Sequence, residues 1–162
     1  MSDTIRPGET LLPFDPGDRI EAGLSFVGVI RSDWSRGDCP RNIARARETG
    51  RPARIELRPG YAAALEGLET GQAIIVIGWL HGARRDLARQ VPRHAGGPRG
   101  TFALRSPVRP NPLSLSVCRI TWMERAAGQL GLDAIDLFDR TPVVDLKPWL
   151  PGADIPPEAH PG

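Results

Sequence analysis

The sequence predicts a mainly β protein, a single antiparallel β-barrel with long loops and at most short helices. Glycine (18) and proline (17) together make 35 of the 162 residues. Because both residues disfavour helix interiors, little room is left for long helices or a helical bundle. Six or seven short runs rich in apolar and β-branched residues alternate with polar segments, a pattern typical of antiparallel barrels and sandwiches.

The chain length suits one domain. Residues 1–22 are polar and rich in Pro and Gly, so we expect an extended N-terminal arm there. The barrel domain is predicted at residues 23–155. A Pro-rich tail is expected at residues 156–162.

The first half of the chain offers three strands. Ser25–Arg31 carries Phe and β-branched residues that favour a strand, whereas residues 32–52 lack an apolar period and are predicted to be a long loop. Arg54–Leu57 is a short strand. Tyr61–Leu68 contains good helix formers and predicts about two helical turns. Gln72–His81 is nearly all apolar, which indicates a buried strand.

The second half begins with a basic loop predicted at residues 82–100, followed by a strand at Thr101–Arg105. Three prolines exclude regular structure from residues 105–112. Leu113–Trp122 starts with alternation that places Leu113, Leu115 and Val117 on one side and Ser114, Ser116 and Cys118 on the other, with Cys118 expected in the core. Gln129–Phe138 and Thr141–Trp149 add one or two more strands.

The basic residues are almost all arginine, since Lys147 is the one lysine among 21. Residues 31–60 hold eight Arg against four acids, and residues 81–109 hold seven Arg against one acid. Codon bias in a GC-rich genome is the favoured explanation of the arginine excess, and the clustering of the arginines agrees with a polyanion partner. Trp34 is the main aromatic candidate for stacking on a nucleic-acid base.

Two cysteines without a CxxC pair do not indicate a disulfide framework or a zinc site. The N-terminus does not resemble a signal peptide. The longest apolar run, residues 73–80, is too short to span a membrane. We therefore expect a cytoplasmic protein with no metal and no membrane partner.

Several segments carry residues suited to anion or nucleoside chemistry. Arg105 and Arg109 flank a proline-stiffened turn, which suits either a preorganised carboxylate or phosphate site or a structural turn with solvated arginines. Asp136 and nearby aspartates can accept hydrogen bonds from a ribose or pair with arginines. His81 ends the apolar strand, where it is either a general base or a polar terminus. Neither a P-loop nor a Rossmann fingerprint occurs.

Read together, five segments resemble the TsaA-like family, also called the tRNA-methyltransferase-O family. They are FVGVIRS at 26–32, CPRN at 39–42, LEGLETGQAIIVIGWLH at 65–81, GGPRGTFALRSPVRPNPLSLS at 96–116 and LDAIDLFDRTPVVDLKPWLPGAD at 132–154. The resemblance implies a β-barrel that binds S-adenosylmethionine (SAM) and forms a homodimer. It also implies methylation at N6 of threonylcarbamoyladenosine, at position 37 of tRNA.

Motif by motif, the resemblance implies eleven cofactor contacts. They are Pro40, Arg41, Asn42, His81, Gly82, Arg105, Leu115, Asp133, Ala134, Ile135 and Asp136. An arginine, Arg41 or Arg105, suits the carboxylate of SAM, and Asp136 suits its ribose diol or its ammonium. No motif fixes the catalytic base, for which His81 and Asp136 are the candidates.

The sequence also departs from the family pattern. Arg140 stands where the usual DGTPV run has a glycine, and Asn42 stands where the usual PRQ run has a glutamine. These departures leave room for a SAM-binding protein that acts on a small molecule, or for a non-catalytic SAM-binding module. A β-barrel RNA-binding module without chemistry is a third, weaker reading.

Overall fold

The computed structural model describes residues 4–92 and 96–156. Within it the chain divides into two compact units. The smaller unit contains the chain up to Ser25 together with Trp79–Ser114, and the larger unit contains Phe26–Gly78 and the chain from Leu115 onward. The domain boundaries expected from the sequence remain a prediction.

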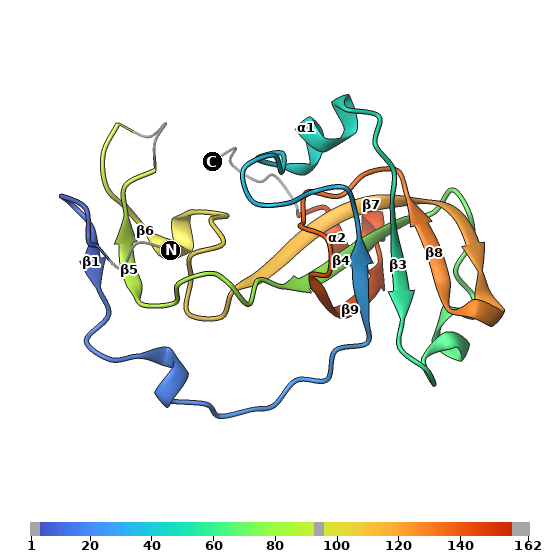
Figure 1. Ribbon diagram of the computed structural model, residues 1–162, viewed down its shortest axis with the longest axis horizontal. Coiled ribbons are helices and arrows are strands. Elements are labelled where there is room, and N and C mark those ends of the chain that lie inside the picture. The colour runs from blue at the N-terminus through green and yellow to red at the C-terminus, as the bar shows by residue number, and fades with distance from the viewer. Residues whose placement is uncertain (1–3, 93–95, 157–162) are drawn as a thin grey trace. The chain divides into compact units, whose positions relative to one another are not determined.

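The larger unit is built on six strands that hydrogen-bond to one another in a closed antiparallel ring (Figure 1). In ring order they are β2 (Gly28–Arg31), β3 (Ala53–Leu57), β8 (Gln129–Leu132), β7 (Leu113–Glu124), β4 (Ala73–Trp79) and β9 (Pro142–Pro148). Trp79 and Leu113–Ser114, at the ends of β4 and β7, belong to the smaller unit. The predicted mainly β, antiparallel class with only short helices is confirmed.

The core of the larger unit lies inside this ring. Because strand side chains alternate between faces, every second residue points inward. The fully buried set includes Ile30, Ile55, Ile74, Val76, Ile120, Leu130, Leu132 and Val143. Burying each of these side chains contributes roughly 1.5–3 kcal/mol. Apolar side chains from all six strands therefore hold the ring together.

The long strand β7 shows the predicted alternation, and its polar side faces inward. Ser116 and Cys118 are 3% and 1% exposed, whereas Leu115 is 47% exposed. The predicted core position of Cys118 is confirmed. A buried serine and an exposed leucine reverse the usual order, and the buried hydroxyl is explained by a carboxylate partner described below.

The smaller unit contains a three-stranded sheet that the sequence did not predict. Its order is β1 (Thr10–Leu11), β5 (Leu87–Gln90), β6 (Arg99–Gly100). Part of the expected extended arm at 1–22 therefore forms a strand. The expected basic loop at 82–100 contains two strands. These strands are two to four residues long and are specified by their pairing, so they leave no periodic signal in the sequence.

Two further assignments differ from the sequence prediction in the smaller unit. Thr101–Ala103 is a 3-10 turn where a strand was expected at Thr101–Arg105. The buried Thr101 hydroxyl donates to the Leu87 carbonyl at 2.6 Å and accepts from Gln90 Nε2 at 2.9 Å. These side-chain bonds keep the segment beside β5 without strand pairing. Residues 105–112 contain neither helix nor strand, as predicted.

The helices are short. Helix α1 (Ile43–Glu48) lies within the segment 32–52 that was expected to be a loop, and Asn42 caps it by accepting a hydrogen bond from the Arg45 amide at 2.9 Å. A capped turn of six residues needs no apolar periodicity, which is why the sequence pattern missed it. Ala62–Leu65 is a 3-10 helix within the helical turns predicted at Tyr61–Leu68. Three short elements remain, α2 (Pro151–Asp154) and 3-10 turns at Pro16–Asp18 and Arg125–Ala127.

Candidate functional site

The segment after β8 carries four of the predicted cofactor contacts and is fastened to β7. The Asp133 carboxylate accepts from the Arg119 amide at 2.8 Å, and the Asp133 amide donates to the Arg119 carbonyl at 3.0 Å. Asp136 accepts from the buried Ser116 hydroxyl at 2.6 Å. Ser116 therefore holds one carboxylate oxygen of Asp136 in place.

Helix α1 is fastened to the same segment by Arg47, a residue the sequence did not single out. Its Nε donates to Asp133 at 2.8 Å, and its Nη2 donates to the Val117 carbonyl at 2.6 Å. Burial acts to raise the pKa of Asp133, but hydrogen bonds from the Arg119 amide and from Arg47, with the charge of Arg47, hold that pKa below its ordinary value. Asp133 is therefore a fixed anion between α1 and β7. Nothing in the sequence distinguishes Arg47 from its neighbour Arg45.

The side chains of Ala134 and Ile135 are fully buried, so only their backbone is available to a ligand. The Ile135 carbonyl accepts from the Trp34 indole Nε1 at 2.8 Å. Trp34 is only 6% exposed. The interpretation of Trp34 as a stacking surface is therefore wrong, because its ring is buried and its Nε1 hydrogen bond holds the 133–136 segment.

The CPRN segment lies close to this cluster in the larger unit. Burial, followed by the charges of Asp136 and Asp38, raises the pKa of the Cys39 thiol to about 11. Pro40 is half-buried, whereas Arg41 and Asn42 are exposed. The larger unit thus brings the CPRN segment near Asp136, whereas Leu115 lies on the exposed side of β7, opposite the Ser116 side that binds Asp136.

The remaining predicted contacts, His81, Gly82 and Arg105, are exposed residues of the smaller unit. The turn after β4 is fixed to the Pro-rich segment, because the Leu80 amide donates to the Pro112 carbonyl at 2.8 Å and Arg85 donates to the Pro110 carbonyl at 2.5 Å. The smaller unit therefore holds the His81–Gly82 turn and the Pro-rich segment 105–112 as neighbours.

The larger unit also contains two clefts, and none of the eleven predicted contacts lines either one. The first, here called the Arg31–Trp122 cleft, has a volume of about 450 Å³ and is lined by Arg31, Ser32, Asp33, Pro52, Ala53, Arg54, Trp122 and Asp139. The second, of about 360 Å³, is lined mainly by residues of the 61–68 and 145–148 segments.

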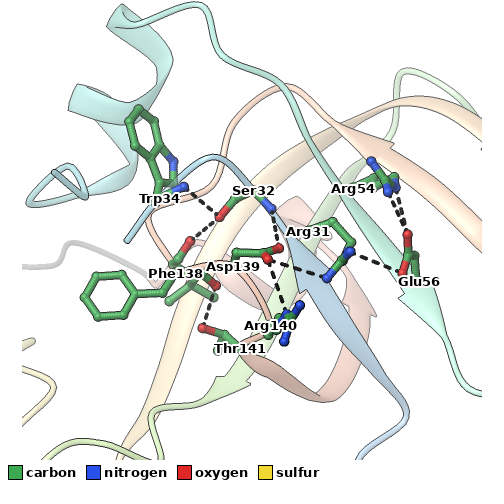
Figure 2. Close-up of polar contacts among 10 residues, drawn as sticks. Arg31, Ser32, Trp34, Arg54, Glu56, Phe138, Asp139, Arg140 and Thr141 are labelled. Atoms are coloured by element: carbon green, nitrogen blue, oxygen red, sulfur yellow. Dashed lines mark hydrogen bonds and ion pairs between the residues drawn. The ribbon is translucent and has the colours of Figure 1, made fainter. Parts of the chain in front are cut away.

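Figure 2 shows the polar network beside the first cleft. Asp139 accepts from the Ser32 amide at 3.2 Å and contacts the Arg31 guanidinium at 3.5 Å. Arg31 also lies 3.4 Å from Glu56. Arg140, which replaces the usual family glycine, has φ 64°, a left-handed conformation that L-residues seldom adopt. The turn therefore keeps its glycine-like backbone while presenting an exposed guanidinium.

In the described residues, 4–92 and 96–156, no group of three or more His, Cys, Asp or Glu side chains is arranged to hold a metal ion. No helix in that part of the chain has the length and apolar character needed to cross a membrane.

The chain is similar to several known proteins. A Rhizobium radiobacter protein named "Probable S-adenosyl-L-methionine-binding protein VirR" is 38% identical over 130 residues, covering 79% of this chain and 71% of the relative. An "S-adenosyl-L-methionine-binding protein" of Archaeoglobus fulgidus is 36% identical over 132 residues, covering 81% of this chain and 91% of the relative.

The crystal structure of TrmO from Pseudomonas aeruginosa superimposes with a TM-score of 0.68 at 34% identity, covering 88% of this chain. The chain spans 62% of the length of that TrmO chain. The family described as "tRNA-methyltransferase O N-terminal domain" matches residues 29–155, a stretch that includes Val29–Arg31 of β2 and the whole of the other five ring strands. The chain therefore belongs to the tRNA-methyltransferase O N-terminal domain family.

Proposed function

We propose that the protein is a SAM-dependent methyltransferase that methylates N6 of threonylcarbamoyladenosine at position 37 of tRNA. The family match starts at Val29, so it contains all six ring strands except Gly28 of β2. The names of the relatives support SAM as the ligand. The observation that carries the proposal is that the CPRN segment lies near Asp136 in the larger unit, where the charge of Asp136 acts on Cys39.

The side chains present suit the chemical groups of SAM. Asp136 is held by Ser116 at 2.6 Å and provides an oriented carboxylate for a ribose diol or an ammonium. Leu115 is 47% exposed and offers apolar surface to an aromatic ring. The exposed guanidiniums of Arg41 and Arg105 suit a carboxylate. Ala134 and Ile135 would contribute backbone groups only, because their side chains are buried.

Bound SAM supplies a methyl group attached to a positively charged sulfur. The protein's part is to hold the acceptor nitrogen in line with that carbon, which is a positioning effect, and to remove the proton that N6 loses. As the new N–C bond forms, the S–C bond breaks and the N6 proton passes to a base. Asp136 and His81 are the two candidates for this base.

The cofactor assignment is tested by replacing Asp136 with Asn and titrating SAM calorimetrically. We expect SAM binding about tenfold weaker, because a charge-assisted hydrogen bond is lost while the side-chain shape is kept. Asp145→Asn, on β9, is the matched control and should bind SAM like the parent. Equal SAM affinity in all three proteins would remove Asp136 from the site.

The substrate is tested separately by nucleoside mass spectrometry of tRNA from a strain that lacks the gene. We expect the methylated threonylcarbamoyladenosine to disappear and the unmethylated nucleoside to accumulate. If the methylated nucleoside persists while the purified protein binds SAM, the tRNA substrate is wrong. A role on a small molecule, or as a non-catalytic SAM-binding module, would then be favoured.

A further inference from the structure

The Arg31–Trp122 cleft is built on one row of residues that crosses four strands of the ring. Arg31 of β2 pairs with Arg54 of β3, Arg54 pairs with Gly131 of β8, and Gly131 pairs with Trp122 of β7. Directly opposite residues in a sheet point to the same face. The inward face is occupied by the neighbouring residues of each strand, such as Ile30 and Ile55, so this row lies on the outer face.

Gly131 is the one residue of this row without a side chain, and the Trp122 indole lies over it. A Cβ atom at position 131 would lie 2.1 Å from Nε1 of Trp122, so the indole ring occupies the space that a side chain would fill. Trp122 is nevertheless 41% exposed. The indole therefore packs against the Gly131 backbone and keeps part of its surface open to solvent, which is the arrangement of an aromatic stacking platform.

The charges beside the indole are balanced. Arg31 and Arg54 line the cleft together with Asp33 and Asp139, two cations against two anions. Arg54 is further engaged by Glu56 at 2.8 Å. A phosphate would gain little from such a balanced set. The edge of a nucleobase carries both donors and acceptors, so guanidinium donors and carboxylate acceptors suit it better.

We propose that the Arg31–Trp122 cleft binds an unpaired nucleobase of the RNA substrate, stacked on Trp122 with its edge toward Arg31, Arg54 and Asp139. The inference rests on the proposed action on tRNA and assigns a part of the RNA to a surface separate from the eleven cofactor contacts. The cleft volume of about 450 Å³ falls within the ~300–1,000 Å³ of ordinary ligand sites.

The test uses Trp122→Leu and Trp122→Phe in the full chain. The probes are a stem-loop RNA with an unpaired loop and its fully paired counterpart, followed by fluorescence anisotropy. We expect Trp122→Leu to bind the stem-loop about tenfold more weakly, because stacking is worth about 1–3 kcal/mol per base. Trp122→Phe keeps a ring and should retain most of the affinity. SAM affinity should be unchanged in both variants.

Arg54→Gln is a second variant, which leaves Trp122 in place over Gly131, and it should weaken stem-loop binding as well. The inference is overturned if Trp122→Leu and Arg54→Gln bind the stem-loop like the parent, or if the parent binds the paired RNA equally well. It is also overturned if a free nucleoside monophosphate binds as tightly as the stem-loop, or if Trp122→Leu converts a dimer into a monomer.

The outcome also separates this inference from the proposed function. Loss of RNA binding with intact SAM binding supports the cleft as an RNA site. Normal tRNA methylation by Trp122→Leu overturns the cleft and leaves the proposed function standing. A parent protein that binds SAM but neither RNA overturns both the cleft and the tRNA substrate.

Discussion

Asp133 shows how a single residue links the candidate site to the fold. Its two carboxylate oxygens receive a backbone amide from Arg119 and the guanidinium of Arg47. The Asp133 side chain is 15% exposed, so these partners replace most of its water. Because the ionised form is favoured in the folded protein, the folded-state pKa lies below the ordinary value. Stability should therefore depend on pH through this group.

We expect Asp133→Asn to lower the free energy of unfolding at neutral pH, and the difference from the parent to shrink in acid. An aspartate with a lowered folded pKa contributes stability that is present above its unfolded pKa of about 3.9 and is lost as pH falls through the folded pKa. Urea unfolding at several pH values below and above about 4 measures this. A difference independent of pH would mean that the charge of Asp133 contributes nothing.

The contact of Arg47 with Asp133 and the Val117 carbonyl can be tested with two variants on helix α1, one at Arg47 and a control at Arg45. Arg47→Gln removes two charge-assisted hydrogen bonds from a half-exposed side chain, and we expect a loss of about 1–2 kcal/mol of stability. Arg45→Gln removes a fully exposed pair with Glu48 and should cost much less stability than Arg47→Gln, because water screens an exposed pair. If urea unfolding shows the same loss of stability for Arg47→Gln and Arg45→Gln, the contacts of Arg47 do not stabilise the fold.

At the scale of elements, Gly28 sets how closely β2 approaches β3. A Cβ atom at position 28 would lie 2.6 Å from the Glu56 backbone carbonyl oxygen and 3.1 Å from the Leu57 Cα. Backbone atoms have no rotamer through which to move aside, so the two strands would have to separate. The family match and the ring both begin at this point of the chain.

Gly28→Ala should therefore destabilise the protein by about 2–3 kcal/mol, because overpacking against backbone forces a shift of the strand pair. Gly23→Ala is the control, since nothing lies within 4 Å of the added methyl group there. Thermal unfolding followed by circular dichroism gives both values. A Gly28→Ala protein that melts with the control would show that β2 tolerates the extra carbon.

The ring strands were predictable from the sequence because each carries its own pattern. The alternation of β7 and the apolar run of β4 report burial directly. The strands of the smaller unit and helix α1 were missed, because two to six residues are too few for a period and their pairing partners lie far away in sequence. The expected core position of Cys118 indicated the inward side of β7, but the pattern did not show that Asp136 is the partner of the buried Ser116 hydroxyl.

The candidate site was predictable only where motifs carried it. The CPRN and LDAID segments led to residues that the larger unit brings together. Arg47 was missed because its role comes from a three-dimensional partner, the distant Asp133. The position of Trp122 over Gly131 of the next strand is likewise absent from the sequence pattern. The choice of Trp34 as a stacking residue was wrong because the sequence does not tell which indole ring is buried.

At the scale of the whole molecule, the two basic segments differ in how their charge is used. In residues 31–60, several arginines contact carboxylates, among them Arg31, Arg45, Arg47 and Arg54. In residues 81–109, Asp86 is the one acidic residue in the sequence, and it contacts Arg84. The segment 81–109 has the larger excess of arginines over acidic residues in the sequence and is the better candidate for contact with phosphates.

Salt dependence tests this assignment through Arg89 and Arg99, which are exposed residues of β5 and β6. The register pairs Arg89 with Gly100 and Gln90 with Arg99, so the side chains of Arg89 and Arg99 point to opposite faces of the strand pair. We expect only one of the two arginines to contact phosphate. Of the variants Arg89→Gln and Arg99→Gln, the one that removes this contact should lower the slope of log affinity against log salt for the stem-loop RNA by about 0.7–0.9. Arg45→Gln, already paired with Glu48 at 2.7 Å, should leave the slope unchanged. If both Arg89→Gln and Arg99→Gln keep the parent slope, this strand pair does not contact phosphate, and the positive charge of the segment acts elsewhere.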